Sequence, residues 1–369
     1  MPLAPPRING PIASSVVPHI APGVDAPAYL ERLETLLGHW LTLSGYDRTA
    51  LEYFQAFTSN LHPMPPYPAW KEYSRLCPDG SPVQFCEIVS HSVSGPAFIV
   101  DPGPYGAPAE MRLQVAADLA SEALARSSSA TATISRIQSL LAAVREREPD
   151  LALCLGYSSG RIGIYFTANS HLRSATWRTM IASLPGFRAQ TNASKSVLAL
   201  LAHYGHRTAV ALQIGASGDR STDISFRIAK ANSPLLDSAA TSAGLSPAPF
   251  RLFLRRILQQ RDAWQDVKAT AAVRISDEGA VEELSFIIDA RRYFRTDDEL
   301  RTTVLSVAPD FDWDISLFRP ASRLLASPGS RPVRSSVAIS ALPAGASRLR
   351  IFSKTGHHAV ETIGQHPHS

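Results

Sequence analysis

Arginine side chains recur at alternating positions in segments of this chain that have the residue pattern of β-strands. In the segment 161–167, Arg161, Gly163 and Tyr165 share one face, and bulky apolar side chains share the other. The formal net charge of +4 at pH 7 fits a small anionic substrate. The cations on such faces are Arg161, Arg227, Lys268, Arg274, Arg348 and Arg350. They could bind an anionic ligand, or they could be solubilising charges at the rim of the fold.

A second pattern indicates hydrolytic chemistry, but its surroundings do not support it. The segment Gly156–Gly160 matches the GxSxG motif of serine hydrolases, which requires a strand, a tight turn and then a helix. The residues that follow Gly160 alternate as a strand does. The pattern therefore favours a hairpin turn over a nucleophilic Ser158.

Composition excludes several other classes of protein. No run of Lys and Arg indicates a nucleic-acid surface, and no apolar run reaches the length of a membrane span. The three cysteines form no CxxC pair, which favours a reducing compartment and argues against a disulfide scaffold or a zinc site. We expect a cytoplasmic protein without a metal site, active as a monomer or weak homodimer.

Five pairs of predicted strands, spaced about sixty residues apart, determine the expected fold. Each pair turns at residues rich in Gly, Asp or Pro, as hairpins do. Helical patterns fill the intervals, so the repeating unit is helix, strand, strand, helix. The predicted pairs are 84–90 with 97–101, 151–156 with 161–167, 208–214 with 223–229, 268–275 with 283–289, and 334–341 with 348–354.

These units predict an α/β (α+β) fold, a ten-stranded antiparallel β-barrel of five αββα repeats ringed by helices. Helices would cover the apolar faces, and the polar faces would surround a lumen too wide for side chains alone to fill. The alternative is two α+β domains, each with an open sheet. We expect the barrel to span residues 25–354, between a disordered segment 1–24 and a flexible tail 355–369.

The N-terminal third carries a more specific pattern. An aromatic-rich helix pair leads into a strand that begins Asp-Gly-Ser-Pro-Val-Gln. This part of the chain, residues 36–102, resembles the indole prenyltransferases of the dimethylallyltryptophan synthase type, whose PT barrel has the αββα (ABBA) fold. The residues that carry the resemblance are Trp40, Gly45, Tyr46, Leu51 to Phe54, Leu61 to Pro63, Pro66, Trp70 and Pro78 to Gln84.

The resemblance implies an aromatic prenyltransferase of specialised metabolism that acts on an indole or related aromatic. A prenyl diphosphate would ionise to an allylic cation, which the electron-rich ring captures without magnesium or another cofactor. Gln84 would accept the N–H of the acceptor, and aromatic faces would shield the cation. The residues expected to hold the diphosphate are Arg161, Tyr165, Arg227, Arg274, Arg348 and Arg350.

The chain departs from the pattern of this family at the positions that matter for its chemistry. Gln84 replaces the glutamate that anchors the indole, and Ala97 stands where the next strand usually has an arginine. Gly163 replaces the lysine of a Lys-x-Tyr pair. Asp223 stands where an arginine is usual, and a carboxylate beside a diphosphate would repel it. The cations that remain lie at other heights of the predicted barrel.

Two alternatives follow from these departures. The barrel could be a cyclase or isomerase that acts on an aromatic or prenylated intermediate without diphosphate. Glu283, Asp223 or Asp289 would then be the candidate acids or bases. It could also be a non-catalytic barrel that binds an aromatic metabolite.

Overall fold

The computed structural model describes residues 26–44, 48–61, 80–91, 95–104, 106–125, 151–168, 189–215, 217–258, 267–324 and 334–355, together with residues 74, 76, 77, 135, 182 and 184. The predicted disordered segment 1–24 and all of the predicted tail 355–369 except Thr355 lie outside these residues, as do almost all of the helical patterns at 135–147 and 175–184. The domain division proposed from the sequence stays a prediction.

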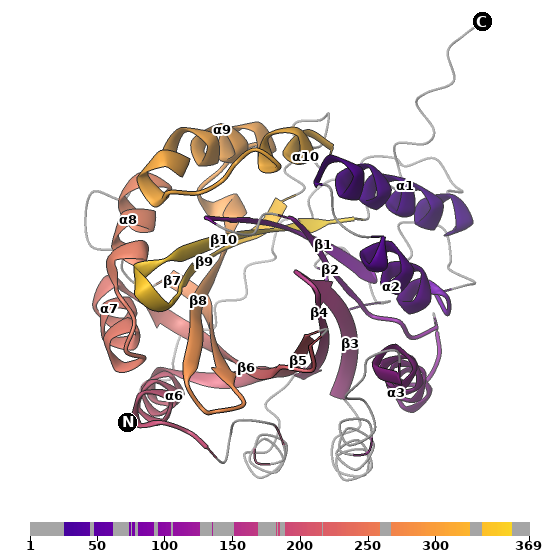
Figure 1. Cartoon of the computed structure of the whole chain (residues 1–369), viewed down its shortest axis with the longest axis horizontal. Helices are drawn as coiled ribbons and strands as arrows, with labels where there is room; N and C mark the ends of the chain where they lie inside the picture. The colour runs from indigo at the N-terminus through magenta and orange to yellow at the C-terminus, as the bar shows by residue number, and fades with distance from the viewer. Residues whose placement is uncertain are drawn as a thin grey trace, which may run out of the picture.

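Ten antiparallel strands form one closed barrel, in the order β1-β10-β9-β8-β7-β6-β5-β4-β3-β2 (Figure 1). Each strand pairs with its neighbours in sequence, and β1 pairs with β10 to close the ring. This confirms the predicted barrel and excludes two open sheets. The strands are β1 (Val83–Ser90), β2 (Gly95–Val100), β3 (Leu151–Ser158), β4 (Arg161–Ala168), β5 (Gly205–Gly215), β6 (Arg220–Ala231), β7 (Val267–Ser276), β8 (Val281–Asp289), β9 (Arg334–Ala341) and β10 (Ser347–Lys354).

Helices surround the strands on the outside (Figure 1). None of the described helices is both long and apolar enough to cross a membrane. The α-helices are α1 (Ala26–Ser44), α2 (Thr49–Thr58), α3 (Ala109–Ala125), α6 (Asn192–Tyr204), α7 (Ser233–Ser242), α8 (Ala248–Arg256), α9 (Asp297–Val307) and α10 (Phe318–Leu324). Helix α7 was not predicted, although its signal is in the sequence: Asn232 caps it by accepting from the Leu235 N–H at 2.9 Å, and a proline follows in its first turn.

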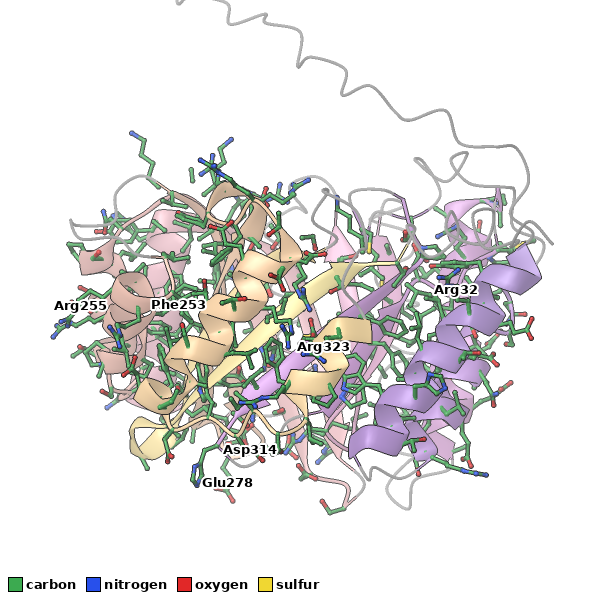
Figure 2. The ribbon with its side chains drawn as sticks, turned by 90° about the horizontal axis from the view of Figure 1, so that it is seen from above. Arg32, Phe253, Arg255, Glu278, Asp314 and Arg323 are labelled. Atoms are coloured by element: carbon green, nitrogen blue, oxygen red, sulfur yellow. The ribbon has the colours of Figure 1, made fainter. Side chains whose placement is uncertain are left out.

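The order of the strands gives the barrel two different ends. All five hairpin turns lie at one end, which we call the hairpin end, and the helical connections lie at the other, the helix end. Figure 2 shows Glu278, in the β7–β8 turn, at the same end as Asp314. Gly156 to Ser158 end strand β3, and Ser159 and Gly160, both with positive φ angles, form the tight turn into β4. The GxSxG pattern therefore lies in a hairpin, as predicted.

The main hydrophobic core lies between the outer face of the barrel and the helices. Ile162, Ile164 and Phe166 of β4 are buried there, as the alternation predicted. Phe54 of α2 packs on Phe98 of β2 with ring centroids 5.2 Å apart. On the opposite side Phe253 of α8 faces inward, whereas Arg255 projects away from the barrel (Figure 2).

A buried ion pair joins the two strands on either side of β10. Arg334 of β9 and Glu87 of β1 lie on the outer face, with Nε 3.0 Å from Oε2 and both side chains no more than 2% exposed. Arg334 also donates to the Ser322 carbonyl of α10 at 2.7 Å and to the Asp297 carbonyl of α9 at 3.1 Å. Burial raises the pKa of Glu87, and Arg334 only partly offsets this effect. One guanidinium thus connects the closing strands to two covering helices.

We expect Arg334→Ala to lower the free energy of unfolding by about 3–5 kcal/mol, because it leaves the Glu87 carboxylate buried without its partner. Urea denaturation measures this change. As a control, Arg256→Ala at the half-exposed pair with Asp310 should change it by less than about 1 kcal/mol. A double variant, Arg334→Met with Glu87→Leu, should recover most of the loss. Equal effects of Arg334→Ala and Arg256→Ala would contradict this assignment.

Candidate functional site

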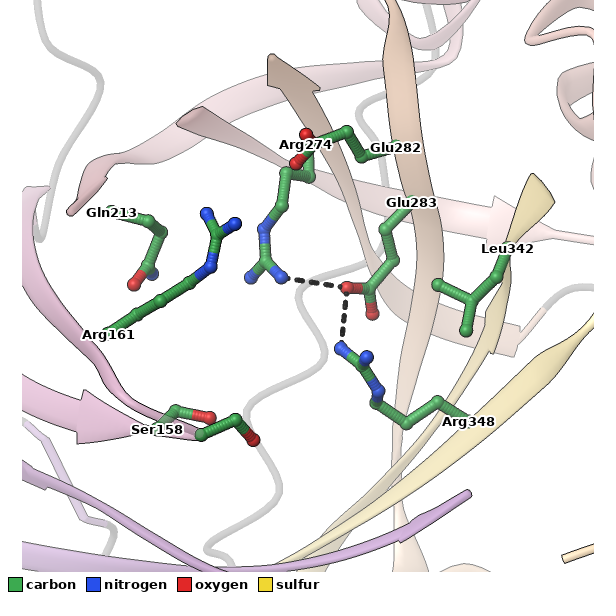
Figure 3. Close-up of a pocket in the computed structure, with 9 residues that line it drawn as sticks. Ser158, Arg161, Gln213, Arg274, Glu282, Glu283, Leu342 and Arg348 are labelled. Atoms are coloured by element: carbon green, nitrogen blue, oxygen red, sulfur yellow. Dashed lines mark hydrogen bonds and ion pairs between the residues drawn. The ribbon is translucent and has the colours of Figure 1, made fainter. Parts of the chain in front are cut away.

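The inner faces of most strands carry small or polar side chains, so the lumen is not filled by an apolar core. Because side chains alternate along a strand, the residues between the buried outer positions face inward. Figure 3 shows Arg161, Arg274 and Arg348 pointing toward one another from different strands. The small inward residues are Ala97, Ala152, Cys154, Gly156, Gly163, Ala209, Ala211, Ser225, Ala272, Ser285, Ala338 and Ser340.

Three arginines converge on the Glu283 carboxylate inside the barrel. Glu283 Oε2 lies 3.0 Å from Nη1 of Arg274 and 3.2 Å from Nη1 of Arg348. Its Oε1 lies 2.5 Å from Nη2 of Arg350 and accepts a hydrogen bond from Ser285 at 3.0 Å. The Glu283 side chain is only 3% exposed, so these charges interact in a largely dry environment.

Asp223 provides a second carboxylate on the other side of Arg274. The Arg274 Nε and Nη2 atoms donate to its two oxygens at 2.7 and 2.9 Å, in the bidentate arrangement typical of strong Arg–carboxylate pairs. This pairing removes the repulsive charge that Asp223 alone would present to an anion. We call Asp223, Arg274, Glu283, Arg348 and Arg350 the Glu283 cluster.

The electrostatics of this cluster indicate that its carboxylates are counter-ions of the arginines and not acid–base catalysts. Burial raises the pKa of the Glu283 carboxyl, but Arg350 and the two other arginines lower it by more, so it lies below its ordinary value. For Arg274 the directions are reversed. Burial lowers its pKa, but Asp223 and Glu283 raise it by more, so it lies above its ordinary value. A carboxylate held in this way is a poor proton acceptor near neutral pH. Asp289, the third carboxylate considered, is bonded to Arg291 at 2.8 and 2.9 Å.

Beside the cluster lies a small polar pocket of about 190 Å³ at the hairpin end of the lumen (Figure 3). Arg161 forms its opposite wall and pairs with Asp219. Glu282 also lines it, half-buried, with its pKa raised by burial. Within the part of the chain that the structure describes, no hydrogen bond or ion pair reaches the Glu282 carboxylate. The lining residues are Ser158, Ser159, Arg161, Gln213, Arg274, Glu282, Glu283, Leu342 and Arg348.

Tyr165 occupies the space that a longer side chain at position 163 would need. A Cβ atom built on Gly163 would lie 2.5 Å from the Tyr165 ring, and one on Gly156 would lie 3.0 Å from it. The ring thus rests over two glycines, and its hydroxyl accepts a hydrogen bond from Gln213 at 3.1 Å. Gln213 donates to Asp223 as well, at 3.1 Å, which links Tyr165 to the Glu283 cluster. Nothing in the strand pattern indicates this contact between neighbouring inward positions.

One sector of the lumen is apolar, although the strand pattern predicted mainly polar, small or cationic inner faces. Cys86 and Ile88 of β1, Ala97 of β2 and Phe352 of β10 form a small hydrophobic cluster separate from the main core. Burial raises the pKa of the Cys86 thiol to about 12, so it stays protonated and acts as an apolar lining group. We call these four residues the apolar wall.

The predicted anion-binding residues fall into two groups. Arg161, Arg274, Arg348 and Arg350 lie toward the hairpin end with the pocket and the cluster. Arg227 is four positions beyond Asp223 on β6, about 13 Å nearer the helix end. It is exposed there, as is Lys268 of β7.

Gln84 also lies at the helix end, where its Cα partner is Lys354 of β10. The proposed acceptor anchor and most of the predicted anion site are therefore at opposite ends of the lumen. In the described part of the chain, no group of three or more His, Cys, Asp or Glu could hold a metal ion.

The chain is similar to solved structures of indole prenyltransferases. PriB in ternary complex with L-tryptophan and dimethylallyl thiolodiphosphate is 17% identical, with a TM-score of 0.70 over 90% of this chain and 97% of that one. The 5-dimethylallyltryptophan synthase from Streptomyces coelicolor is 17% identical, with a TM-score of 0.69 over 89% and 97%. AnaPT from Neosartorya fischeri is 14% identical, with a TM-score of 0.59 over 90% and 92%. No family model and no curated protein sequence matches the chain. The similarity confirms the PT-barrel fold expected from the sequence.

We expect Gly163→Ala to lower the free energy of unfolding by about 1 kcal/mol or more, since the added methyl displaces the Tyr165 ring from Gln213. Urea denaturation measures the change. As the matched control, Gly38→Ala in α1 meets no atom within 4 Å and should stabilise the protein by up to about 1 kcal/mol. A neutral or stabilising Gly163→Ala would show that the ring does not depend on this space.

Proposed function

We propose that this chain transfers an allylic prenyl group from a prenyl diphosphate to an indole or related aromatic acceptor inside the barrel. The observation that supports this most directly is the convergence of Arg274, Arg348 and Arg350 beside an apolar wall in the lumen. The fold is shared with PriB, whose ternary complex contains L-tryptophan and dimethylallyl thiolodiphosphate. A role in specialised metabolism is part of the proposal.

The inner face of the β1–β10 pair presents cationic, apolar and polar positions in order along the barrel axis. From the hairpin end, Arg350 is followed on β10 by Phe352. Their Cα partners on β1 are Ile88 and Cys86, and Gln84 follows at the helix end. A ligand with an anionic head, an apolar middle and a polar far group fits this order. A prenyl diphosphate with an aromatic acceptor beyond its tail has such a form.

In the proposed reaction the bond between the prenyl carbon and oxygen breaks, and its electron pair leaves with the diphosphate. The allylic cation is captured by a carbon of the aromatic ring, a carbon–carbon bond forms, and the ring loses a proton. The arginines would stabilise the leaving group by charge-assisted hydrogen bonds. Phe352 would offer a π-face to the cation, and Gln84 would accept the N–H of the acceptor. Because guanidinium groups supply the positive charge, the proposal requires no divalent metal.

The carboxylates that already neutralise most of the arginine charge favour a second candidate function. Three arginines and two carboxylates leave the Glu283 cluster with a net charge of only +1. Such a site has less attraction for a diphosphate than three unpaired arginines. The alternative is a barrel that cyclises or rearranges an uncharged aromatic or prenylated compound, or one that only binds it. The cytoplasmic location and the oligomeric state stay predictions from the sequence.

Titration calorimetry with dimethylallyl and geranyl diphosphate, without and then with magnesium, tests the main proposal. We expect binding of at least one donor without metal, and Arg350→Ala should weaken it tenfold or more because a guanidinium–diphosphate contact is lost. Arg227→Ala, at the far end of the lumen, should weaken it much less. If neither donor binds, the transferase function is wrong and the cyclase or binding function is preferred.

Gln84→Glu tests the acceptor site. A carboxylate polarises a bound indole N–H more than an amide oxygen does, so we expect the rate of indole alkylation to rise several-fold. Steady-state kinetics with saturating donor measures this, and Gln84→Leu should lower the rate. If both variants react as the parent protein does, Gln84 does not contact the acceptor.

A further inference from the structure

Glu283 lies at the point where an anionic ligand of the arginines would have to bind. The carboxylate takes N–H donors from Arg274 of β7 and from Arg348 and Arg350 of β10. A phosphate oxygen has the same preference for bidentate guanidinium contacts as a carboxylate oxygen. The carboxylate and a bound diphosphate would therefore compete for the same hydrogens.

The neighbouring Glu282 shows that the contact with the arginines is specific to Glu283. Pairing of β7 with β8 shifts between Arg274 with Glu283 and Ile275 with Val281, which leaves Glu282 as the extra residue of a bulge. Without the bulge, adjacent residues would face opposite sides of the sheet. Both Glu282 and Glu283 line the pocket (Figure 3), yet only Glu283 holds arginines.

The cluster retains a donor that Glu283 does not use. The Nε atom of Arg348 is buried and makes no hydrogen bond within the described residues. Buried donors without a partner are uncommon in folded proteins. Among the described residues this N–H has no acceptor, so the cluster contains a guanidinium donor that its carboxylates do not use.

We infer that Glu283 is an internal competitor of the diphosphate, and that it determines how tightly the site retains this group. The inference rests on the proposed function. In the empty site Glu283 holds the three arginines, and the donor diphosphate displaces it from part of them. After transfer the carboxylate recaptures the guanidiniums and promotes release of inorganic diphosphate. The exchange makes and breaks hydrogen bonds only, and no proton moves. Burial favours the neutral form, but the arginines keep the pKa of Glu283 below its ordinary value, so the competitor stays charged.

The test is the affinity of the full-length protein for inorganic diphosphate, measured by calorimetry at fixed salt concentration. We expect Glu283→Gln to bind at least tenfold more tightly, because the amide no longer neutralises the arginines. Glu282→Gln is the matched control, since it removes an equal charge from the same pocket without releasing an arginine. It should tighten binding by less than threefold. Unchanged or weaker binding by Glu283→Gln, or equal tightening in both variants, overturns the inference.

A second variant keeps the test decisive if Glu283→Gln does not fold. Glu283→Asp retains the charge but is one methylene shorter, so it cannot reach all three arginines and should bind diphosphate more tightly than the parent protein. Affinity equal to that of the parent overturns the inference.

Transfer assays separate this inference from the proposed function. Where prenyl transfer occurs, Glu283→Gln should lower both kcat and the KM for the donor, as expected when release becomes slower. If Glu283→Gln binds diphosphate more tightly but the parent protein transfers no prenyl group, the inference is supported and the transferase function is refuted. Transfer by the parent with diphosphate affinity unchanged in Glu283→Gln supports the transferase and refutes the inference.

Discussion

Pairing of the first strand with the last is the constraint on which the rest of this structure depends. Until β1 and β10 pair, there is no lumen, and β10 has a neighbouring strand on only one of its two edges. The seam is reinforced on the outside by Glu87 and Arg334, which are 247 residues apart in the chain. Closure of so long a loop costs conformational entropy that only contacts made after closure can offset. A buried ion pair that also binds α9 and α10 makes barrel closure and helix packing depend on each other.

Closure also explains why the interior contains carboxylates. The strand order β7-β8-β9-β10, curved by closure, places Arg274, Arg348 and Arg350 around Glu283 on one inner face, in a region with little solvent. Like charges placed together under those conditions destabilise a fold unless opposite charges accompany them. Glu283 and Asp223 supply these charges. The same two carboxylates that allow the empty barrel to fold therefore reduce its attraction for an anion, so folding and ligand binding oppose each other at this site.

Alternation along the strands was enough to predict which residues face the lumen, because a strand has only two faces. It predicted the inward positions of Arg161, Tyr165 and Arg274 correctly. Alternation could not predict how far along the barrel axis a residue lies, or which residues of other strands it contacts. Both depend on register and on bulges that one residue can create. Arg227 was grouped with the other cations for this reason, although its register places it toward the helix end.

The bulge at Glu282 had no signal in the local sequence, and neither did the contact between Tyr165 and Gly163. Both depend on how a strand meets its neighbour, which the pattern within one strand does not contain. The apolar wall was missed for a different reason. Its residues come from β1, β2 and β10, and each is a single apolar side chain among polar ones. Only closure places them together.

The charge reversal at Asp223 shows how one departure from the family pattern is compensated. The resemblance leads one to expect an arginine there, and a carboxylate alone would make the inner face of β6 unfavourable for an anion. Its Cα partner on β7 is Arg274, which binds both Asp223 oxygens. The cation has thus moved by one strand instead of being lost. Ala97 has no such compensation on β2, and the cations of β10 lie beyond β1 from it. Gly163 shares the inner face of β4 with Arg161. The positive charge around Glu283 therefore comes from β7 and β10, on both sides of β8.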